Sequence, residues 1–534
     1  MELVLLGIFL LMSFVQSLDL RIDPLVFTSQ GLVRGQKATD GDYTTFLGIP
    51  YATVDENNPF GPATPHTAFD EIIFRANDGS AKCPQTDALP LARDSDTQTI
   101  DCLKLNIYVP NEASSYNPLP VLVWIHGGVF AFGSAGEYNP RKLVTQGVVV
   151  VTINYRLGPY GFMCLDVPTV PGNQGLKDQF EALRWIRNNI GSFGGNPYNV
   201  TIAGHSAGAC SVLLHLYSSK EKLFHKVIVE SGTPQSEGMF INGDVNAAIK
   251  LAEYLLFNTT DTEQALAFLA STPHKLVTAA ASALDFDLKL RPCKERSFSG
   301  IENLVEDDPY SLSNVRKITN TPVLIGHTSK EEKNAIAYRS NYYDTDPFYD
   351  KIVNNYNLNN VIASKVSSMV RHYYIGDKDI SEEVASELED FESDFIFNHP
   401  MQRVITELLN ENANPVYQYL FSYVDGSQEE GAAHSAELKY LFGMPDFNEL
   451  TEDEKSISDS MVTMWTNFVK FGNPTPAASG LVTWIPSTSE SRPYLVIDNN
   501  MRMESRIYKE RMAFWDLFHE NYGSTNVLAR VCKV

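Results

Sequence analysis

The sequence predicts an α/β protein whose central, mostly parallel sheet is flanked by helices. The first observation is a set of short apolar runs, rich in β-branched residues and bounded by Gly, Pro or Asn. Runs that are apolar at every position suit strands buried on both faces, as in a parallel sheet covered by helices. The second observation is that helix-like segments alternate with these runs, which is typical of strand–helix–strand units.

The predicted elements follow in chain order. The predicted strands are residues 120–125 (PVLVWI), 148–155 (VVVVTINY), 200–204 (VTIAG), 226–231 (KVIVES) and 321–326 (TPVLIG). Two helices lie between them: residues 174–193 place apolar side chains at helical spacing, and residues 209–216 follow the third strand. Residues 244–410 are more polar and helical, so we expect helical insertions that cover the sheet.

Composition limits the possible partners and the compartment. The chain has 534 residues and a formal net charge of −23, which disfavours nucleic acids and anionic membranes because both require a basic face. The apolar run from Leu3 to Val15 with small residues near Ser17 predicts a signal peptide over residues 1–17, cleaved near Ser17. No later run is long enough to span a bilayer, so we expect a secreted, extracellular protein without a membrane anchor.

Cysteines and glycosylation sequons fit that compartment. Cys83 and Cys102 are close enough in sequence to close a short loop, and we expect them to pair. Cys532 could pair between chains. The other three are expected to be buried free thiols: Cys164, Cys210 and Cys293. Asn199 and Asn258 match the N-glycosylation pattern, and Asn258 is the better acceptor because Asn199 adjoins a strand.

The stretch Gly204-His205-Ser206-Ala207-Gly208 lies between a predicted strand and a predicted helix. A glycine-x-serine-x-glycine pattern alone is weak, but this context is the one that a nucleophile elbow requires. The turn is sharp and its neighbours must be small, while the helix N-terminus directs N–H groups at an oxyanion formed beside Ser206. Ser206 is therefore a candidate nucleophile.

A serine nucleophile needs a base and a group that orients the base. Glu331 follows the predicted strand 321–326, with Glu332 as the competing acid. His434 lies on a small-residue loop before a predicted helix and is the candidate base. Three other downstream histidines lie in helix-like segments or before a proline: His372, His399 and His519.

His126-Gly127-Gly128 ends another predicted strand. Adjacent glycines can turn two backbone N–H groups toward one point, which with the N–H of Ala207 would give three oxyanion donors. An ordinary Gly-Gly loop is the alternative for this motif alone. The two glycine motifs together favour catalysis, since each follows a strand and they occur in the expected order.

These motifs resemble those of the carboxylesterase and cholinesterase family of α/β-hydrolases, over nearly all of the mature chain. Further matching segments are FLGIPYA (46–52), DCLKLNIY (101–108), NYRLGPYGF (154–162), GNQGLKDQ (172–179), FGGNP (193–197), VIVESG (227–232) and NFVKFGNP (467–474). The resemblance implies an α/β-hydrolase domain over residues 18–534, with helical insertions over the active site.

The resemblance also implies roles for individual residues. It implies that Ser206, Glu331 and His434 form a catalytic triad, and that the oxyanion hole is formed by Gly127, Gly128 and Ala207. It also implies that Ser231 supports the triad and that Cys83 and Cys102 form the family's first disulfide. Such an enzyme needs no metal and no cofactor, and the chain lacks zinc-ligand spacing and phosphate-binding glycine loops.

Several positions depart from the family pattern. Lys330-Glu331-Glu332 replaces the commoner acid-Glu-Gly, which leaves Glu332 as an alternative acid. The loop between Cys83 and Cys102 contains no aromatic residue to hold a quaternary ammonium, which disfavours choline esters. His205 stands where juvenile-hormone esterases typically carry glutamine. The sequence looks most like secreted insect carboxylesterases, including antennal and integument esterases.

The sequence thus predicts a secreted serine carboxylesterase that hydrolyses small-molecule esters through an acyl-enzyme intermediate. Odorant or pheromone acetates, hormone esters, dietary lipids and xenobiotic esters are the candidate substrates. The alternative is a binding protein of the same fold, either an adhesion-type member or a scavenger that is acylated without turnover.

Overall fold

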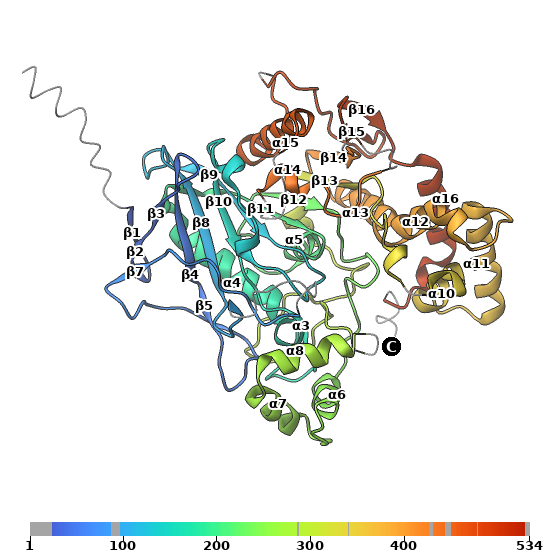
Figure 1. Cartoon of the computed structure of the whole chain (residues 1–534), viewed down its shortest axis with the longest axis horizontal. Coiled ribbons are helices and arrows are strands. Elements are labelled where there is room, and N and C mark those ends of the chain that lie inside the picture. Colours follow the sequence, from blue (N-terminus) through green and yellow to red (C-terminus); the bar gives the residue numbers. More distant parts are fainter. Residues whose placement is uncertain are drawn as a thin grey trace, which may run out of the picture.

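The computed structural model describes residues 24–528 except 87–96, 286–287, 340, 425, 427–430, 444–449 and 478. Within these residues the largest sheet has eleven strands in the order β16-β15-β14-β13-β12-β11-β9-β10-β8-β4-β3 (Figure 1). Their bounds are β3 Gln36–Lys37, β4 Tyr43–Pro50, β8 Lys104–Pro110, β9 Leu119–Ile125, β10 Val149–Ile153, β11 Gly195–His205, β12 Lys226–Glu230, β13 Val323–Thr328, β14 Val416–Phe421, β15 Pro493–Ile497 and β16 Arg502–Ser505.

The predicted mostly parallel sheet is confirmed. All five predicted strands are present, as β9 to β13. In the part of the sheet with the order β10-β9-β11-β12-β13-β14-β15, every pair of neighbouring strands is parallel. The flanking pairs β10–β8, β8–β4, β4–β3 and β15–β16 are antiparallel. Two smaller sheets contain β1 (Leu25–Thr28), β2 (Gly31–Arg34) and β7 (Ile73–Arg75), and β5 (Ala52–Thr53) and β6 (Thr64–Pro65).

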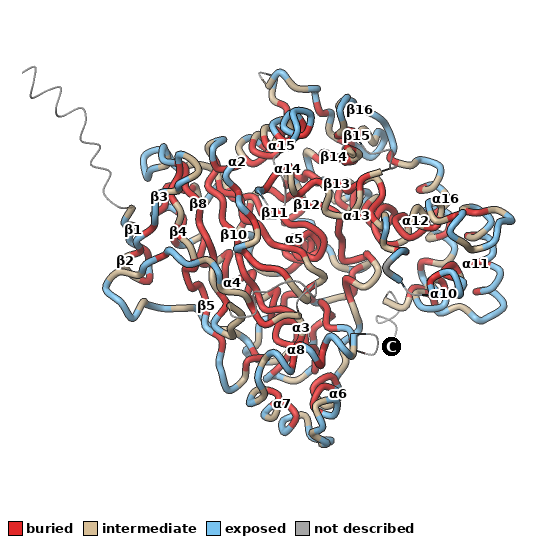
Figure 2. Tube along the Cα trace, viewed as in Figure 1, coloured by how far each residue is buried: buried red, intermediate tan, exposed pale blue. Residues whose placement is uncertain are grey.

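Both faces of the sheet are covered, which explains why its strands are apolar at every position (Figure 2). Along β9, Val123 and Ile125 pack into one core with α4 (Gln174–Asn189) and α5 (Ala207–Tyr217). The intervening Trp124 packs into the opposite core with α15 (Glu452–Phe471). Because successive side chains of a strand point to opposite faces of the sheet, alternate residues of β9 pack into different cores.

The region 244–410 contains the expected helices. They are α6 Ala247–Tyr254, α7 Thr262–Ser271, α8 His274–Ala283, α9 Val315–Ile318, α10 Pro347–Asn355, α11 Asn360–Ile375, α12 Ala385–Ser393 and α13 His399–Asn410. Helices α6 to α8 lie together at one end of the molecule, while α10 to α12 pack with the C-terminal α16 (Lys509–Tyr522) around a separate apolar core (Figure 1). The remaining helices are α2 Arg141–Val144, α3 Gly158–Phe162 and α14 Leu438–Leu441, with short helical turns between these elements.

The disulfides confirm one cysteine prediction and correct another. Cys83 and Cys102 form the expected bond. The prediction that Cys164 and Cys293 are free thiols was wrong, because these two residues, 129 positions apart, form a second disulfide. Their pairing depends on tertiary structure, which brings the end of α3 against the chain that follows α8. Cys210 is buried and free as predicted, and Cys532 lies outside the described residues.

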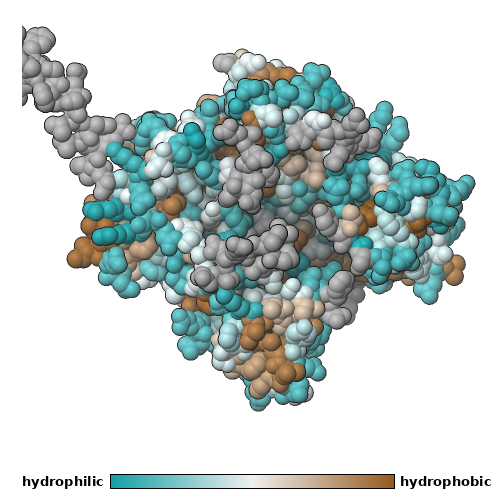
Figure 3. Space-filling view, viewed as in Figure 1, coloured by the Kyte–Doolittle hydropathy of each residue, from teal (hydrophilic) through white to brown (hydrophobic). Residues whose placement is uncertain are grey.

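The face shown in Figure 3 has several apolar areas, two of which lie over elements already described. One lies over the small sheet of β1, β2 and β7, where Phe27 and Ile72 are exposed. The other lies over α6 and α7, where Tyr254 and Leu256 are exposed. The rest of this face is mainly polar, in keeping with the acidic composition.

Candidate active site

Ser206 occupies a sharp turn between β11 and α5, with φ 56° and ψ −120°. Few residues with a side chain adopt this backbone conformation, and strain of this kind clusters at functional sites. A Cβ on Gly208 would lie 2.0 Å from the carbonyl oxygen of Ile125, and a Cβ on Gly204 would lie 2.4 Å from the carbonyl carbon of Gly208. The two glycines are therefore needed because strand, turn and helix approach one another too closely for any side chain.

The backbone of Ser206 is tied to the neighbouring strand. Its N–H donates to the carbonyl of Glu230 at the end of β12, at 2.8 Å. A Cβ on Gly232 would lie 2.2 Å from the carbonyl oxygen of Ser206, so that segment passes directly against the turn. Ser231, between these two contacts, places its hydroxyl 2.6 Å from Glu331 Oε1. The proposed nucleophile and the proposed acid are thus linked through one short segment.

The loop after β9 lies against Ser206. A Cβ on Gly127 would be 2.7 Å from the carbonyl oxygen of His205 and 3.2 Å from Ser206 Cβ. Gly128 follows with φ +100°, a conformation that favours glycine. Ala207 is the first residue of α5, so its N–H has no acceptor within the helix and lies at the positive end of the helix dipole.

The same loop contains a feature that the sequence did not indicate. Val129 and Phe130 have φ values of +45° and +60°. A β-branched residue in the left-handed region is a clear outlier. His126, which precedes the loop, contacts Tyr155 in two ways. The two rings stack with their centroids 4.4 Å apart, and the His126 carbonyl accepts a hydrogen bond from the Tyr155 hydroxyl at 2.8 Å. The packing of buried aromatic rings thus fixes the strained loop.

Glu331 and His434 form an ion-paired hydrogen bond. Glu331 Oε2 lies 2.5 Å from His434 Nδ1, and the backbone N–H of His434 donates to the Glu331 carbonyl at 3.2 Å. The other carboxylate oxygen of Glu331 accepts from the Thr328 N–H at 2.8 Å and from Ser231. The Glu331 side chain is fully buried, whereas that of His434 is about 30% exposed. This exposure leaves the imidazole open toward a substrate.

The alternative acid, Glu332, has different partners. Its carboxylate accepts from Arg339 at 2.8 Å, and its backbone N–H donates to Ser393 Oγ at 2.9 Å. The geometry therefore favours Glu331 over Glu332 as the partner of His434.

The charges of the pair support each other. Burial alone would lower the pKa of His434, but the neighbouring Glu331 carboxylate outweighs it, so the pKa is raised above its ordinary value. Burial would likewise raise the pKa of Glu331, but His434 and the hydrogen bond from Ser231 hold it below its ordinary value. Glu331 is thus ionised at neutral pH and stabilises the protonated form of His434.

Two further buried carboxyl groups, those of Glu230 and Glu437, lie near Glu331 and His434. Burial raises the pKa of Glu230 to about 8, although Trp465 Nε1 donates to its Oε1 at 2.7 Å. Burial and the nearby Glu230 also raise the pKa of Glu437 to about 8. Glu437 Oε1 lies 3.3 Å from Ser231 Oγ. Neither carboxyl group was predicted at the site from the sequence.

Two rings flank His434. The ring of His205 lies 4.5 Å from it and that of Phe397 lies 5.0 Å from it, measured between centroids. His205 is buried, and its pKa is lowered by burial and by His434. Because His205 precedes Ser206, this contact brings the histidine and the serine turn together. Phe397 comes from a π-helical turn at Asp394–Asn398, and π-helical turns are frequent at functional sites.

The three other downstream histidines lie elsewhere. His372 is exposed on α11, 3.8 Å from Asp377. His399 Nε2 lies 3.2 Å from Asp516, and His519 contacts Arg403. All three histidines thus have contacts with residues other than Glu331.

A cavity of about 370 Å³ adjoins the loop after β9. Val129, Ala131 and Phe132 line it from that loop, and Leu288 and Leu290 line it from the chain after α8. The size falls in the range of small-molecule sites. These five residues are apolar, and polar side chains including Gln85, Ser282 and Asp285 line the rest of the cavity. Since Gly127 contacts Ser206 in the same loop, the cavity is the candidate site for part of a substrate.

The sequons differ in accessibility. The Asn199 side chain donates to the carbonyl of Lys470 at 3.3 Å and also contacts Lys226. Asn258 is exposed on the loop after α6. The expected signal peptide, residues 1–17, lies outside the described residues.

Among the described residues, no group of three or more His, Cys, Asp or Glu side chains is arranged to hold a metal ion. No helix in the described part of the chain has the length and apolar character needed to cross a bilayer.

Comparison with known proteins gives consistent matches. The model of the family described as "Carboxylesterase family" matches residues 22–515. The chain is 32% identical to juvenile hormone esterase of Heliothis virescens over 491 residues, which cover 83% of this chain and 85% of that relative. It is 30% identical to pyrethroid hydrolase Ces2e of Rattus norvegicus, covering 95% and 92%, and 28% identical to venom carboxylesterase-6 of Apis mellifera, covering 93% and 95%.

Proposed function

The chain belongs to the carboxylesterase family of carboxylic ester hydrolases, and from this premise we propose that it is a serine esterase that works through an acyl-enzyme. The observation that carries the proposal is the buried Glu331 carboxylate 2.5 Å from His434 Nδ1, beside a strained serine turn. In this arrangement Glu331 fixes the tautomer of His434, so that Nε2 is free to act as a base.

The proposed reaction has two steps. His434 Nε2 takes the hydroxyl proton of Ser206 as Ser206 Oγ attacks the ester carbonyl carbon, and it then returns that proton to the leaving alcohol. Water next attacks the acyl-enzyme, with His434 again as base, and releases the acid and free Ser206. Glu331 stabilises the imidazolium that forms in each step.

The negative oxygen of each tetrahedral intermediate would be bound by backbone donors. The proposed donors are the N–H groups of Gly127, Gly128 and Ala207. Loss of one such donor costs about a hundredfold or more in rate. Ser231 is a positioning residue in this scheme, because its hydroxyl contacts Glu331 rather than the substrate.

We further propose that residues 1–17 are a signal peptide, that residues 18–534 form one catalytic domain and that the enzyme is secreted. The two disulfides support an oxidising compartment. Asn258 is the preferred glycosylation site because it is exposed, whereas the Asn199 amide is occupied by hydrogen bonds. Hormone and xenobiotic esters are candidate substrates by analogy with two relatives named for such activities, and odorant or pheromone acetates remain candidates from the sequence.

The test is time-resolved release of nitrophenol from p-nitrophenyl acetate by the purified protein and its Ser206→Ala variant. Sustained turnover by the wild type that is lost in the variant is the expected result. A single stoichiometric burst would instead support the scavenger alternative, and equal background release by both proteins would overturn the catalytic proposal for this ester.

A further inference from the structure

The cavity beside the loop after β9 contains a cationic side chain that ester hydrolysis itself does not use. Arg291 lines this cavity together with Leu288 and Leu290, yet it is only 8% exposed. Arginine is almost never buried to this degree unless it is paired. Its partners therefore decide whether it has a structural or a recognition role.

The guanidinium of Arg291 is only partly satisfied. Nη1 donates to the carbonyl of Leu290 at 3.0 Å, and Nη2 lies 3.5 Å from Asp285 Oδ1. The Asp285 side chain is 55% exposed, so it holds a hydrated position at the rim rather than a buried ion pair. Nε is buried and has no hydrogen-bond partner in the described part of the chain. A guanidinium has five N–H donors. Because the Nε–H is buried, the donors left for a ligand in the cavity are the N–H groups of Nη1 and Nη2 that these two contacts do not use.

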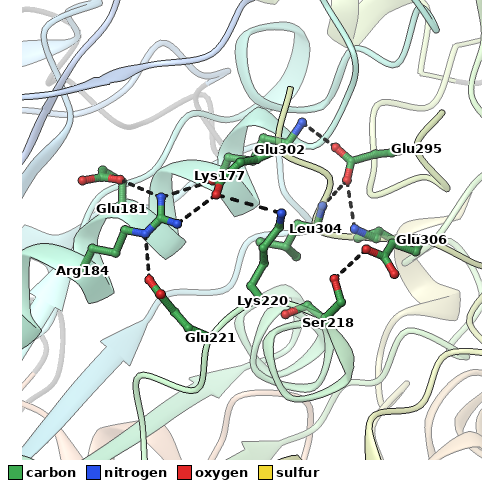
Figure 4. A network of polar contacts seen from close by, with 12 residues as sticks. Lys177, Glu181, Arg184, Ser218, Lys220, Glu221, Glu295, Glu302, Leu304 and Glu306 are labelled. Atoms are coloured by element: carbon green, nitrogen blue, oxygen red, sulfur yellow. Dashed lines mark hydrogen bonds and ion pairs between the residues drawn. The ribbon is translucent and has the colours of Figure 1, made fainter. Parts of the chain in front are cut away.

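The wall that carries Arg291 is fixed. Two residues further on, Cys293 is bonded to Cys164. Next, Glu295 pairs with Lys177 of α4 at 2.5 Å and accepts the backbone N–H of Leu304, as Figure 4 shows. These contacts anchor the segment after Arg291 to a helix that covers the sheet. The backbone that carries Arg291 is thus held in place before a ligand arrives, which lowers the entropic cost of binding.

We propose that Arg291 binds a hydrogen-bond-accepting oxygen near the end of an apolar chain of the substrate ester. This inference rests on the proposed esterase function and names the substrate class for that site. The apolar walls contact the chain, and the unpartnered donors take the oxygen. A carboxylate and a neutral carbonyl share this chemistry, and the experiment separates them.

The experiment compares three esters of one leaving group and one chain length. They are p-nitrophenyl hexanoate, the p-nitrophenyl ester of monomethyl adipate and the p-nitrophenyl monoester of adipic acid. They differ only in the chain end, which is a methyl group, a neutral ester or a carboxylate. The kcat/KM of each is measured for the wild type, Arg291→Leu and the control Arg296→Leu, since Arg296 is exposed five residues further on.

The expected result is a fall of about tenfold or more in kcat/KM of Arg291→Leu for at least one oxygen-bearing ester, through KM. The hexanoate value should change less than threefold, and Arg296→Leu should match the wild type. A fall confined to the adipate monoester identifies a carboxylate ligand, and a fall for both identifies a general acceptor site. Equal effects on all three esters, or no effect, would overturn the proposal.

Two further arms keep the test decisive. If Arg291→Leu does not fold, the kcat/KM values of Arg291→Lys and the KM values of the wild type are compared among the three esters instead. Equal wild-type KM values for the three esters would overturn the inference. A wild type that hydrolyses none of the esters would contradict the proposed function itself, which is a different failure from active hydrolysis without dependence on Arg291.

Discussion

Gly208→Ala tests the reason for the small residues around Ser206. The added Cβ would lie 2.0 Å from the Ile125 carbonyl oxygen, whereas ordinary contacts begin at 3.4 Å, so helix and strand must separate by about 1.4 Å (3.4 minus 2.0). Ile125 pairs with Gly204 in the sheet and directly precedes the loop after β9, so it cannot move alone. A misplacement of about 1 Å costs roughly a hundredfold in rate. Overpacking costs about 1–3 kcal/mol in stability.

The assay is kcat/KM with p-nitrophenyl acetate, alongside thermal unfolding. Gly191→Ala is the matched control, because Gly191 does not have a positive φ and its Cβ would meet nothing within 4 Å. We expect the control to retain wild-type activity and Tm, and Gly208→Ala to lose at least a hundredfold in kcat/KM with a lower Tm. Normal activity and stability of Gly208→Ala would refute the argument that close approach explains this glycine.

The remaining predictions concern charge and cross-links. The acid limb of the pH profile of kcat/KM should have its midpoint above 6.5, the ordinary His434 value, and Glu331→Gln should move it to lower pH because the neighbouring negative charge is lost. Burial raises the pKa of Glu230 to about 8, so between about pH 4.5 and 8 the folded protein keeps a proton that the unfolded chain loses, and wild-type stability should fall as the pH rises over this range. The Tm of Glu230→Gln, measured over the same range, should fall less. Identical slopes of Tm against pH for the two proteins would contradict a buried, protonated Glu230. Replacing Cys164 and Cys293 by Ser should lower the free energy of unfolding by about 1.7 kcal/mol more than replacing Cys83 and Cys102 by Ser. The two disulfides close loops of 129 and 19 residues, and the loop-closure entropies differ by 1.5RT ln(129/19). Denaturant unfolding of both double variants checks this order.

Much of the site was predictable because its signals are local. The apolar runs define buried parallel strands, and the small residues around Ser206 report a turn at the end of one of them. Glu331 also follows a predicted strand, so its place at the same edge of the sheet follows from parallel topology. The choice between Glu331 and Glu332 required coordinates, because adjacent carboxylates differ only in the direction in which each side chain points.

Features that depend on long-range packing were not predictable. The Cys164–Cys293 bond joins segments 129 residues apart, and nothing near either cysteine indicates the other. The positive φ of Val129 is likewise invisible, since valine disfavours that conformation and only the surrounding packing imposes it. That the guanidinium of Arg291 is only partly satisfied is evident only once its few acceptors are known.

The buried carboxyl groups raise the question of which of them carry a negative charge beside His434 at neutral pH. Ser231 has one hydroxyl hydrogen, and at 2.6 Å it goes to the ionised Glu331. Glu437 Oε1 lies 3.3 Å from the same hydroxyl oxygen, and burial together with the nearby Glu230 raises the pKa of Glu437 to about 8. We predict that Glu437 keeps its proton near neutral pH and donates it to Ser231, which would leave Glu331 as the ionised carboxylate of this chain, because different environments push carboxyl pKa values apart.

Glu437→Gln tests this arrangement, because an amide N–H can replace the donor without adding charge. We expect kcat/KM near neutral pH within threefold of wild type and an unchanged acid limb, in contrast to Glu331→Gln. Above about pH 8 the wild type should lose activity as Glu437 ionises and its donor disappears, whereas the variant should not. If Glu437→Gln instead lowers the midpoint of the acid limb as far as Glu331→Gln does, Glu437 must be a carboxylate at neutral pH, and His434 would be paired with two charges rather than one.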